Sequence, residues 1–203
     1  MRYLKIKRLC DIFFSLLLII LSFPILLIIA IAIYLTSPGP IIYKGKRSGL
    51  NEKIFKIYKF RTMIINAEKL GGFSTAKDDI RLIKIGRFLR KFKLDELPQL
   101  FNVLNGEMSF VGPRPQVTYY TSKYDGKLKK ILTVRPGITD LATLEFTDMD
   151  KILGSKDVDK YYEKEIEPKK NILRLNYIYQ ISFFLDLKIL FLTFLTLIKI
   201  KKK

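Results

Sequence analysis

One long apolar run constrains this chain more than any other feature of its sequence. From Ile12 to Tyr43 no residue carries a charge, and the segment Ile12–Leu35 is almost wholly aliphatic. As one straight helix, that segment would extend roughly 36 Å, which is enough to span the hydrocarbon core of a bilayer. The sequence therefore predicts a membrane-embedded helix near its beginning.

The middle of this run is interrupted by Ser22 and Pro24. Proline removes a backbone donor and bends a helix, and a serine hydroxyl can satisfy a freed carbonyl in lipid. Both flanks are basic, with Arg2, Lys5, Lys7 and Arg8 before the run and Lys44, Lys46 and Arg47 after it. Because basic flanks stay cytoplasmic, we expect residues 1–40 to form a re-entrant hairpin that turns at Ser22-Phe23-Pro24. An ordinary kinked transmembrane helix is the alternative.

Composition limits the chemistry that the remaining residues can perform. The 203 residues include 37 Lys and Arg against 19 Asp and Glu, one cysteine (Cys10) and no histidine. The net charge of +18 is typical of proteins that meet an anionic surface and anionic ligands, either phosphates or nucleic acid. The lack of histidine excludes Ser-His-Asp and Cys-His catalysis and histidine-ligated metals. In an enzyme of this composition, carboxylates must act as the nucleophile and the acid or base.

Residues 41–180 are polar and read as a globular domain. Residues 54–63 alternate as a strand that places Ile57, Lys59 and Arg61 on one face. Residues 80–93 form a basic amphipathic pattern with Leu82, Ile85, Leu89 and Phe92 on its apolar side. Such a helix either lies on anionic headgroups or covers a core with its charged face in water.

A second helical pattern covers residues 94–106, LDELPQLFNVLNG. Its apolar residues recur at helical spacing, and Asn105-Gly106 is expected to end it as a left-handed cap. We expect Asp95 at the N-cap and Glu96 at the first helical position. Acidic pairs at a helix start usually only cap, but the same place also suits an ionised, nucleophilic carboxylate.

Two arginines lie beside prolines, which restrict the backbone: Arg114 in FVGPRPQ and Arg135 in VRPGIT. Rigidly held arginines suit a diphosphate, because less side-chain entropy is lost on binding. Each turn alone could be an ordinary surface turn. Together with Lys59, Arg61 and Arg90 they predict a phosphate-binding set.

The chain ends in a second apolar helical pattern at residues 181–203. Its uncharged part, Ile189–Ile198, has ten residues and is too short to span a bilayer. Polar residues gather on one side of the helical wheel, and a lysine cluster follows. We expect an interfacial amphipathic helix, with a core helix as the alternative.

These segments together resemble a known family. KRLCDIFFSLLLIILSFP, SPGPIIYKGKRSG, FKIYKFRTM, DIRLIKIGRFLRKFKLDELPQLFNVLNGEMSFVGPRP, VRPGIT and FFLDLKIL are similar, in this order, to the monotopic phosphoglycosyl transferases, bacterial sugar transferases that start glycan assembly on a polyprenyl phosphate. The resemblance covers essentially the whole chain and is closest to the minimal form of the family.

The resemblance implies a catalytic Asp95-Glu96 dyad and a Mg²⁺ cofactor at Asp95, with Glu96 as a second candidate ligand. It places Arg90 near the substrate phosphates and the membrane-helix break at Ser22 and Pro24. Asp79 and Arg81 match a further family pattern, Asp-x-Arg. The implied fold is α+β and predominantly helical: a small cytoplasmic domain with an N-terminal re-entrant membrane helix and interfacial helices.

The implied reaction is transfer of a sugar 1-phosphate from a UDP-sugar to undecaprenyl (polyprenyl) phosphate, through an aspartyl-phosphosugar intermediate, with release of UMP. The implied place is the bacterial inner membrane, with the active site facing the cytoplasm. The product would begin a capsule, O-antigen, exopolysaccharide or glycoprotein glycan. The expected partners are the UDP-sugar, polyprenyl phosphate and membrane lipid, without nucleic acid; a homo-oligomer is left open.

The sequence leaves the sugar open. Many relatives continue PGIT with Gly-Trp-Ala-Gln, where this chain has Asp140-Leu141-Ala142-Thr143, and residues 144–180 also differ from the smallest relatives. At the membrane break, Phe23 separates the serine and proline that are commonly adjacent in the family. Two readings from other classes remain: a membrane-tethered nucleic-acid-binding protein, which would also explain the charge, and a membrane scaffold without catalysis.

Overall fold

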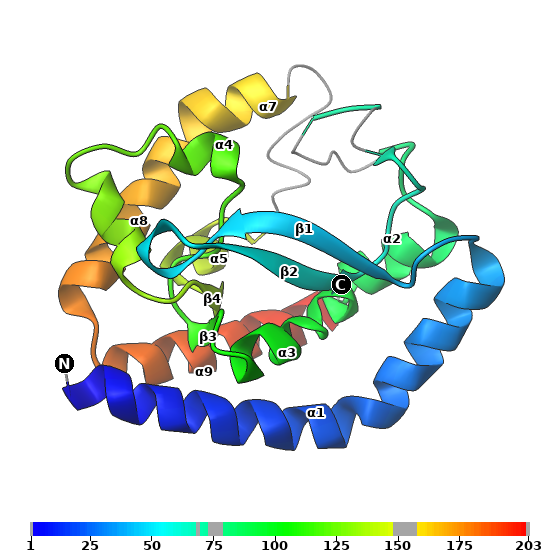
Figure 1. Cartoon of the computed structure of the whole chain (residues 1–203), viewed down its shortest axis with the longest axis horizontal. Helices are drawn as coiled ribbons and strands as arrows, with labels where there is room; N and C mark the ends of the chain where they lie inside the picture. Colours follow the sequence, from blue (N-terminus) through cyan, green and yellow to red (C-terminus); the bar gives the residue numbers. More distant parts are fainter. Residues whose placement is uncertain (1, 68–69, 73–78, 148–157, 202–203) are drawn as a thin grey trace.

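The computed structural model describes residues 2–67, 70–72, 79–147 and 158–201, and it begins with one very long helix. Helix α1 runs from Arg2 to Thr36 and contains Pro24. It changes direction in its middle, so that a first limb lies along the lower side of the molecule and a second limb rises from it (Figure 1). The predicted hairpin corner at residues 22–24 is therefore a bend within a continuous helix, not a turn that reverses the chain.

Ser22 and Pro24 explain the bend in a way that differs in detail from the prediction. Pro24 cannot donate to the carbonyl of Ile20, four residues earlier, so one helical hydrogen bond is missing. The Ser22 hydroxyl donates to the Leu18 carbonyl at 2.6 Å, one turn before the serine, and not to the Ile20 carbonyl that Pro24 leaves unpaired. Hydroxyl back-bonding of this kind itself bends helices, so the two residues act together.

The first limb of α1 is attached to the rest of the protein by buried polar contacts. Asp11 accepts hydrogen bonds from Ser109 Oγ and the Phe110 backbone N–H, both at 3.1 Å. The guanidinium of Arg8 donates to the carbonyls of Val103 and Leu104, at the C-terminal end of helix α3 (Gln99–Leu104). The predicted anchor and catalytic segments thus share contacts, and the boundary at residue 40 stays a prediction.

Much of α1 nevertheless remains exposed apolar surface. Tyr3–Thr36 is long and apolar enough to cross a membrane; its most apolar stretch of 18 residues has a mean hydropathy of 3.2, and 17% of that stretch is buried. Burying these side chains in lipid would recover roughly 25 cal/mol for each Å² removed from water. Together with the family relationship described below, this helix indicates membrane association.

Two small sheets follow α1. Strands β1 (Ile42–Ser48) and β2 (Ile54–Phe60) form an antiparallel pair in which Lys44 lies opposite Tyr58. Strands β3 (Ser109–Val111) and β4 (Gly137–Thr139) form a short parallel pair. The predicted strand at 54–63 is confirmed to Phe60, and Arg61 lies just beyond its end.

Helix α2 (Lys84–Lys91) resolves one of the alternatives left by the sequence. Its Ile85 and Leu89 pack in a core cluster with Phe60 and with Leu26 and Ile29 from the second limb of α1. The apolar side of α2 therefore covers a core, and its basic side faces outward. The alternative in which this apolar side of α2 lies on lipid headgroups is therefore wrong.

The remaining elements are short except near the end of the chain. They are η1 (Leu50–Glu52), η3 (Leu94–Glu96), α3 (Gln99–Leu104), α4 (Thr118–Thr121), η4 (Leu128–Thr133), α5 (Leu141–Glu145), α7 (Val158–Tyr161), η5 (Tyr162–Ile166), α8 (Glu167–Gln180) and α9 (Phe183–Lys201). The expectation of a predominantly helical fold with a small sheet content is confirmed.

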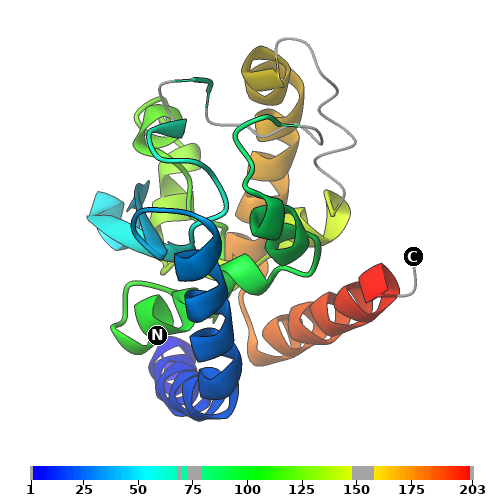
Figure 2. The ribbon, with the colours of Figure 1, turned by 90° about the vertical axis from the view of Figure 1, so that its right-hand side faces the viewer.

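Helix α9 is a helix as predicted, but its polar side faces the protein. Asp186 and Ile189 are buried, and Thr193 Oγ1 hydrogen-bonds Thr139 Oγ1 at 2.7 Å. The exposed side carries Leu190, Phe191, Phe194, Leu195 and Ile198. In both views α9 and the first limb of α1 lie at the lower end of the molecule (Figures 1 and 2), and both helices carry exposed apolar side chains.

Candidate active site

The acidic pair Asp95-Glu96 lies in η3, between α2 and α3. Lys93 before it has a left-handed backbone with φ 58°, which ends α2 and redirects the chain into this single 3₁₀ turn. Helix α3 begins only at Gln99, with Pro98 at its N-cap position and no side-chain cap. The prediction that Asp95 caps this helix is therefore wrong, whereas the left-handed cap at Gly106 (φ 83°) is confirmed.

Glu96 is held by two cations. Its Oε1 accepts a hydrogen bond from Lys59 Nζ at 2.8 Å and forms an ion pair with Arg114 Nη2. Burial alone would raise the pKa of Glu96, but the charges of Arg114 and Lys59 outweigh burial and hold that pKa well below its usual value. Glu96 is therefore ionised throughout the neutral range.

Asp95 sits in a contrasting environment one residue earlier. Its side chain is buried, at 5% exposure, and none of the described residues donates a hydrogen bond to its carboxylate. Burial raises its pKa; Lys59 opposes this change, and the like charge of Glu96 adds to it. A desolvated carboxylate without donors is a stronger nucleophile and base than one bound by hydrogen bonds, so the environment of Asp95 suits a nucleophile better than that of Glu96 does, and its catalytic role stays a prediction.

Arg90 and the Asp79–Arg81 pair lie on the α2 side of the dyad. The charge of Arg90 lowers the pKa values of both Asp95 and Asp79, which places its guanidinium near the two carboxylates. Arg81 holds Asp79 through Nε and Nη2, at 2.9 and 2.6 Å. The predicted neighbourhood of Arg90 and Asp95 is thus present, and its role with phosphates stays a prediction.

Arg114 lies in the proline-rich turn (residues 113–116), and it is held by strand β4 and by the residue that follows that strand. Its backbone N–H donates to Asp140 Oδ2 at 2.9 Å, and its Nη1 donates to the Ile138 carbonyl at 2.7 Å. Gly112 and Gly137 let the segments after β3 and in β4 approach closely, since a Cβ at Gly137 would lie 2.1 Å from the Gly112 nitrogen. Asp140 also accepts from the Thr143 N–H at 2.6 Å and so caps α5 while it positions Arg114.

Asn102 positions Lys59, a role that the sequence did not predict. It is fully buried on α3, accepts from the Tyr58 N–H at 2.9 Å and donates to the Lys56 carbonyl at 2.8 Å. The side-chain amide thereby forms the hydrogen bonds with the β2 backbone that a neighbouring strand would otherwise form. Because Lys59 follows directly, this contact fixes the lysine beside Glu96.

Two of the predicted phosphate ligands lie elsewhere. Arg61 donates through both terminal nitrogens to the carbonyls of Ser37 and Pro38, just after α1 ends. Arg135 donates to the Gly106 carbonyl at 2.8 Å, beyond the C-terminal end of α3, while the dyad precedes its N-terminal end. Both arginines support backbone in this structure, so the structure brings together only Lys59, Arg90 and Arg114 of the predicted set.

The donor set near the dyad fits a Mg²⁺ ion with few protein ligands. Asp95 accepts no hydrogen bond from the described residues, and Glu96 Oε2 has no partner there. The described residues contain no group of three acidic, cysteine or histidine side chains that could form a complete metal cage. Mg²⁺ commonly uses one or two carboxylates and takes its other ligands from substrate phosphates and water.

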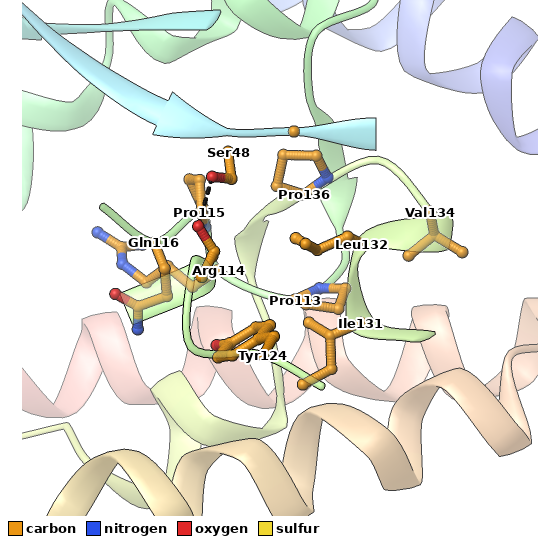
Figure 3. A pocket seen from close by; sticks show the side chains of 12 residues that line it. Ser48, Pro113, Arg114, Pro115, Gln116, Tyr124, Ile131, Leu132, Val134 and Pro136 are labelled. Carbon is orange, nitrogen blue, oxygen red and sulfur yellow. Dashed lines mark hydrogen bonds between the residues drawn. The ribbon is translucent and has the colours of Figure 1, made fainter. Parts of the chain in front are cut away.

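A small cavity lies on the other side of the proline-rich turn. It is lined by Pro113, Pro115, Tyr124, Leu132 and Pro136, among other residues, and has a volume of about 10 Å³ for a water-sized probe (Figure 3). This volume admits about one water molecule, which is too little for a nucleotide. The cavity lies beside Arg114 but is not lined by the dyad, so we do not assign substrate to it.

A buried polar cluster, here called the α8 network, backs the proline-rich turn. Arg174 Nη1 donates to Glu167 Oε1 at 2.9 Å and to Asn171 Oδ1 at 2.7 Å. Tyr124 OH donates to Glu167 Oε1 at 2.9 Å, and Gln116 Nε2 donates to Glu167 Oε2 at 3.0 Å. The network connects the turn at residues 114–116 to helix α8.

Comparison with known proteins agrees with this geometry. Residues 2–200 match the family model described as bacterial sugar transferase. The chain is 43% identical over 190 residues to the UDP-glucose:undecaprenyl-phosphate glucose-1-phosphate transferase of Klebsiella pneumoniae, covering 92% of this chain and 39% of that protein. It is 46% identical over 127 residues to a putative undecaprenyl-phosphate N-acetylgalactosaminyl 1-phosphate transferase of Bacillus subtilis, covering 63% of this chain and 71% of that protein.

A third relative is the UDP-N-acetylgalactosamine-undecaprenyl-phosphate N-acetylgalactosaminephosphotransferase of Aeromonas hydrophila. It is 38% identical over 168 residues, which cover 80% of this chain and 40% of that protein. The chain thus spans about two fifths of the length of the Klebsiella and Aeromonas relatives. Since the family model matches almost every residue, the chain belongs to the bacterial sugar transferase family.

Proposed function

We propose that this protein transfers a sugar 1-phosphate from a UDP-sugar to undecaprenyl phosphate or a similar polyprenyl phosphate. The products are polyprenyl-diphospho-sugar and UMP. Family membership and the printed activities of the relatives support this reaction class. The observation that carries the proposal is the asymmetry of the dyad, in which Glu96 is paired with two cations and Asp95 is buried without a donor.

The first half-reaction uses Asp95 as the nucleophile. An Asp95 carboxylate oxygen attacks the phosphorus that bears the sugar, and the bond from that phosphorus to the UMP oxygen breaks. UMP leaves with the bonding electron pair, and the sugar phosphate becomes an acyl phosphate on Asp95. Phosphoryl transfer depends mainly on positioning and charge stabilisation. Lys59 and Arg114 hold Glu96 in place and supply positive charge at this position.

The second half-reaction regenerates the enzyme. An oxygen of polyprenyl phosphate attacks the same phosphorus, and the bond to Asp95 breaks, which returns the free carboxylate. Asp95 and Glu96 are the residues that would hold Mg²⁺, which would offset the charge of the diphosphate when bound. The raised pKa of Asp95 suits a group that must both attack and leave.

The apolar helices explain how a lipid acceptor reaches the dyad. Helix α9 and the first limb of α1 lie at the lower end of the molecule in Figure 1, and both carry exposed apolar side chains. Leu94 of η3 packs against the core cluster that contains Leu26 and Ile29 of the second limb. In this proposal α1 enters one leaflet of the bacterial inner membrane, and the dyad faces the cytoplasm. Transfer would be the first membrane step in assembly of a glycan.

The test is UMP release from a panel of UDP-sugars. With Mg²⁺, a suitable UDP-sugar and no lipid acceptor, the enzyme should release UMP up to about one equivalent and then stop. Addition of polyprenyl phosphate should restore turnover. The panel should include UDP-glucose and UDP-N-acetylgalactosamine, which the names of the relatives suggest. Absence of UMP release with every member would contradict the proposal.

A further inference from the structure

Helix α8 carries a lysine, Lys170, that lies outside every motif described above. Lys170 lies in the first turns of α8 and is partly buried. Among lysines whose side chains the structure describes, the only others that are not fully exposed are Lys7 and Lys59. Each of those two forms an ion pair, with Asp186 and Glu96 respectively. Within the described residues, Lys170 forms none.

The acidic residues nearest to Lys170 are already engaged. The negative charges of Asp140 and Glu167 raise the pKa of Lys170, but the oxygens of these two carboxylates accept hydrogen bonds from other groups. Asp140 receives donors from Arg114 and Thr143, and Glu167 from Arg174, Tyr124, Gln116 and Tyr162. The ammonium group instead lies over the rings of Phe146 and Tyr162, with distances of 5.5 and 5.0 Å to the ring centroids.

Lys170 also lies in a positive environment. Burial and the charges of Arg174 and Arg114 lower its pKa to about 8, against the opposing effect of Asp140 and Glu167. Arg114 in turn contacts Glu96 of the dyad. Contacts link this position to the dyad: Arg174, one helical turn after Lys170 on α8, lies 3.8 Å from Asp140, which accepts a hydrogen bond from the Arg114 backbone N–H. A row of charged groups thus runs from Lys59 through Glu96 and Arg114 towards Lys170, and Lys170 has no ion-pair partner among the residues that the structure describes. A cation kept partly buried without an anion is costly unless a ligand supplies one.

We infer that Lys170 is a further substrate-binding residue that holds a phosphate group beyond Arg114. The ligand class is a phosphate ester, which is either the diphosphate of the nucleotide sugar or the phosphate of the polyprenyl acceptor. This assignment rests on the proposed function. The exposed neighbour Lys169 has the same charge and lies on the same helix, so it provides a matched control.

The experiment compares Lys170→Met, Lys170→Arg and Lys169→Met in the full-length protein, purified in detergent. Titration calorimetry with UDP as the probe measures nucleotide binding, and the KM for polyprenyl phosphate measures acceptor binding. A hydrogen bond to a charged group contributes about 1.5–3 kcal/mol, so Lys170→Met should weaken one of the two by about tenfold or more. Lys170→Arg should retain most of the binding, and Lys169→Met should match the wild type.

A raised Kd for UDP in Lys170→Met would assign the nucleotide diphosphate to Lys170. A raised KM for polyprenyl phosphate alone would assign the phosphate of the acceptor to it. If Lys170→Met changes neither quantity, or if Lys169→Met changes them equally, the inference is wrong. UDP binding can be measured whether or not any sugar is transferred. A wild-type protein that binds UDP through Lys170 but releases no UMP would therefore contradict the proposed function and leave this assignment intact.

The pH dependence provides an independent readout. The groups that act on Lys170 are Arg174, Arg114, Asp140 and Glu167, and Tyr162 beside it has a pKa raised to about 12 by burial. Lys170 should lose its proton as the pH rises through about 8. UDP or acceptor affinity should therefore fall between about pH 7 and pH 9 in the wild type and stay level in Lys170→Arg, because arginine remains protonated. Equal pH profiles in the two proteins would overturn the assignment.

Discussion

Two polar clusters lie on either side of the proline-rich turn, and they differ in how completely their charges are paired. In the α8 network, both oxygens of Glu167 accept hydrogen bonds, and Arg174 faces Glu167 at 2.9 Å and Asp140 at 3.8 Å. Among the described residues, none donates a hydrogen bond to the Asp95 carboxylate at the dyad, and none pairs a carboxylate with the ammonium of Lys170 on the far side of Arg114.

This difference separates structural charge from functional charge. A buried network whose members satisfy one another fixes a geometry, and removal of one member leaves unpaired charge. A buried group that lacks a partner lowers stability and persists where a ligand or reaction uses it. Two buried carboxylates, Glu167 and Asp95, therefore have opposite environments within one small domain.

The largest expected effect is that of Asp95→Asn on catalysis. The amide keeps the size of the side chain but removes the nucleophilic charge, so turnover should fall by about 10³-fold or more. The melting temperature should stay equal or rise, because the replaced carboxylate is buried without a donor. Steady-state UMP release and thermal unfolding measure the two effects. Near-normal turnover would rule out Asp95 as the nucleophile.

Arg174→Met should have its main effect on folding. It removes the cation from the α8 network and leaves the buried negative charge of Glu167 without its ion-pair partner, although Tyr124, Gln116 and Tyr162 still donate hydrogen bonds to it. This loss should cost about 3–5 kcal/mol of unfolding free energy. Thermal or denaturant unfolding of the purified protein provides the measurement. Arg174→Lys should recover part of the loss, because it restores the charge. An unchanged melting temperature in Arg174→Met would show that the network does not stabilise the fold.

A third prediction compares two arginines that the sequence treated alike. Arg114→Gln removes the ion pair with Glu96 and should lower kcat/KM by about 10²-fold, which corresponds to loss of a charged hydrogen bond of about 3 kcal/mol. Arg135→Gln removes a contact with the Gly106 carbonyl and should lower kcat/KM less than tenfold. Steady-state kinetics in UDP-sugar decide the order. Equal losses would indicate that Arg135 reaches the substrate after all.

The smallest expected effect is a separation of activity from stability at acid pH. Asp95 has a raised pKa and must be ionised to attack, so activity should fall first as the pH decreases from neutral. Glu96 has a lowered pKa, so the stability from its ion pairs is present above its unfolded pKa and is lost only as the pH falls through its folded pKa. Single-turnover UMP release and melting temperature should be recorded across the same buffers. Loss of both at the same pH would contradict the distinct environments of the two carboxylates.

Local patterns predicted most elements of the fold. The apolar run, the alternation at residues 54–60 and the spacing in LDELPQLFNVLNG each correspond to an element in the structure. The failures came from tertiary contacts. Asp95 does not cap α3, because Lys93 adopts a left-handed backbone that creates a separate turn. The apolar side of α2 packs on the bent second limb of α1, a contact that depends on the direction of the bend.

The sequence allowed the motif residues of the site to be predicted, but not the residues that hold them in place. Asp95, Glu96 and Arg114 belong to short segments with a recognisable pattern. Asn102 accepts a hydrogen bond from the Tyr58 backbone N–H, 44 positions away in the sequence. Lys170 differs from other lysines only because the carboxylates near it are bonded to other groups, which the sequence does not reveal. Arg135 carries the same local signal as Arg114, a cation beside a proline. Only the three-dimensional contacts distinguish the two, because Arg114 pairs with Glu96 and Arg135 donates to the Gly106 carbonyl.

The central claim is that Asp95 forms a covalent bond to the sugar phosphate, and mapping of that adduct tests it most directly. The wild-type enzyme should be incubated with Mg²⁺ and an accepted UDP-sugar without lipid acceptor, quenched, digested and analysed by mass spectrometry. The account predicts a phosphosugar on the peptide that contains Asp95, its loss when polyprenyl phosphate is added before quenching, and its absence in Asp95→Asn. An adduct on another residue, or full turnover with no adduct on any peptide, would contradict the account.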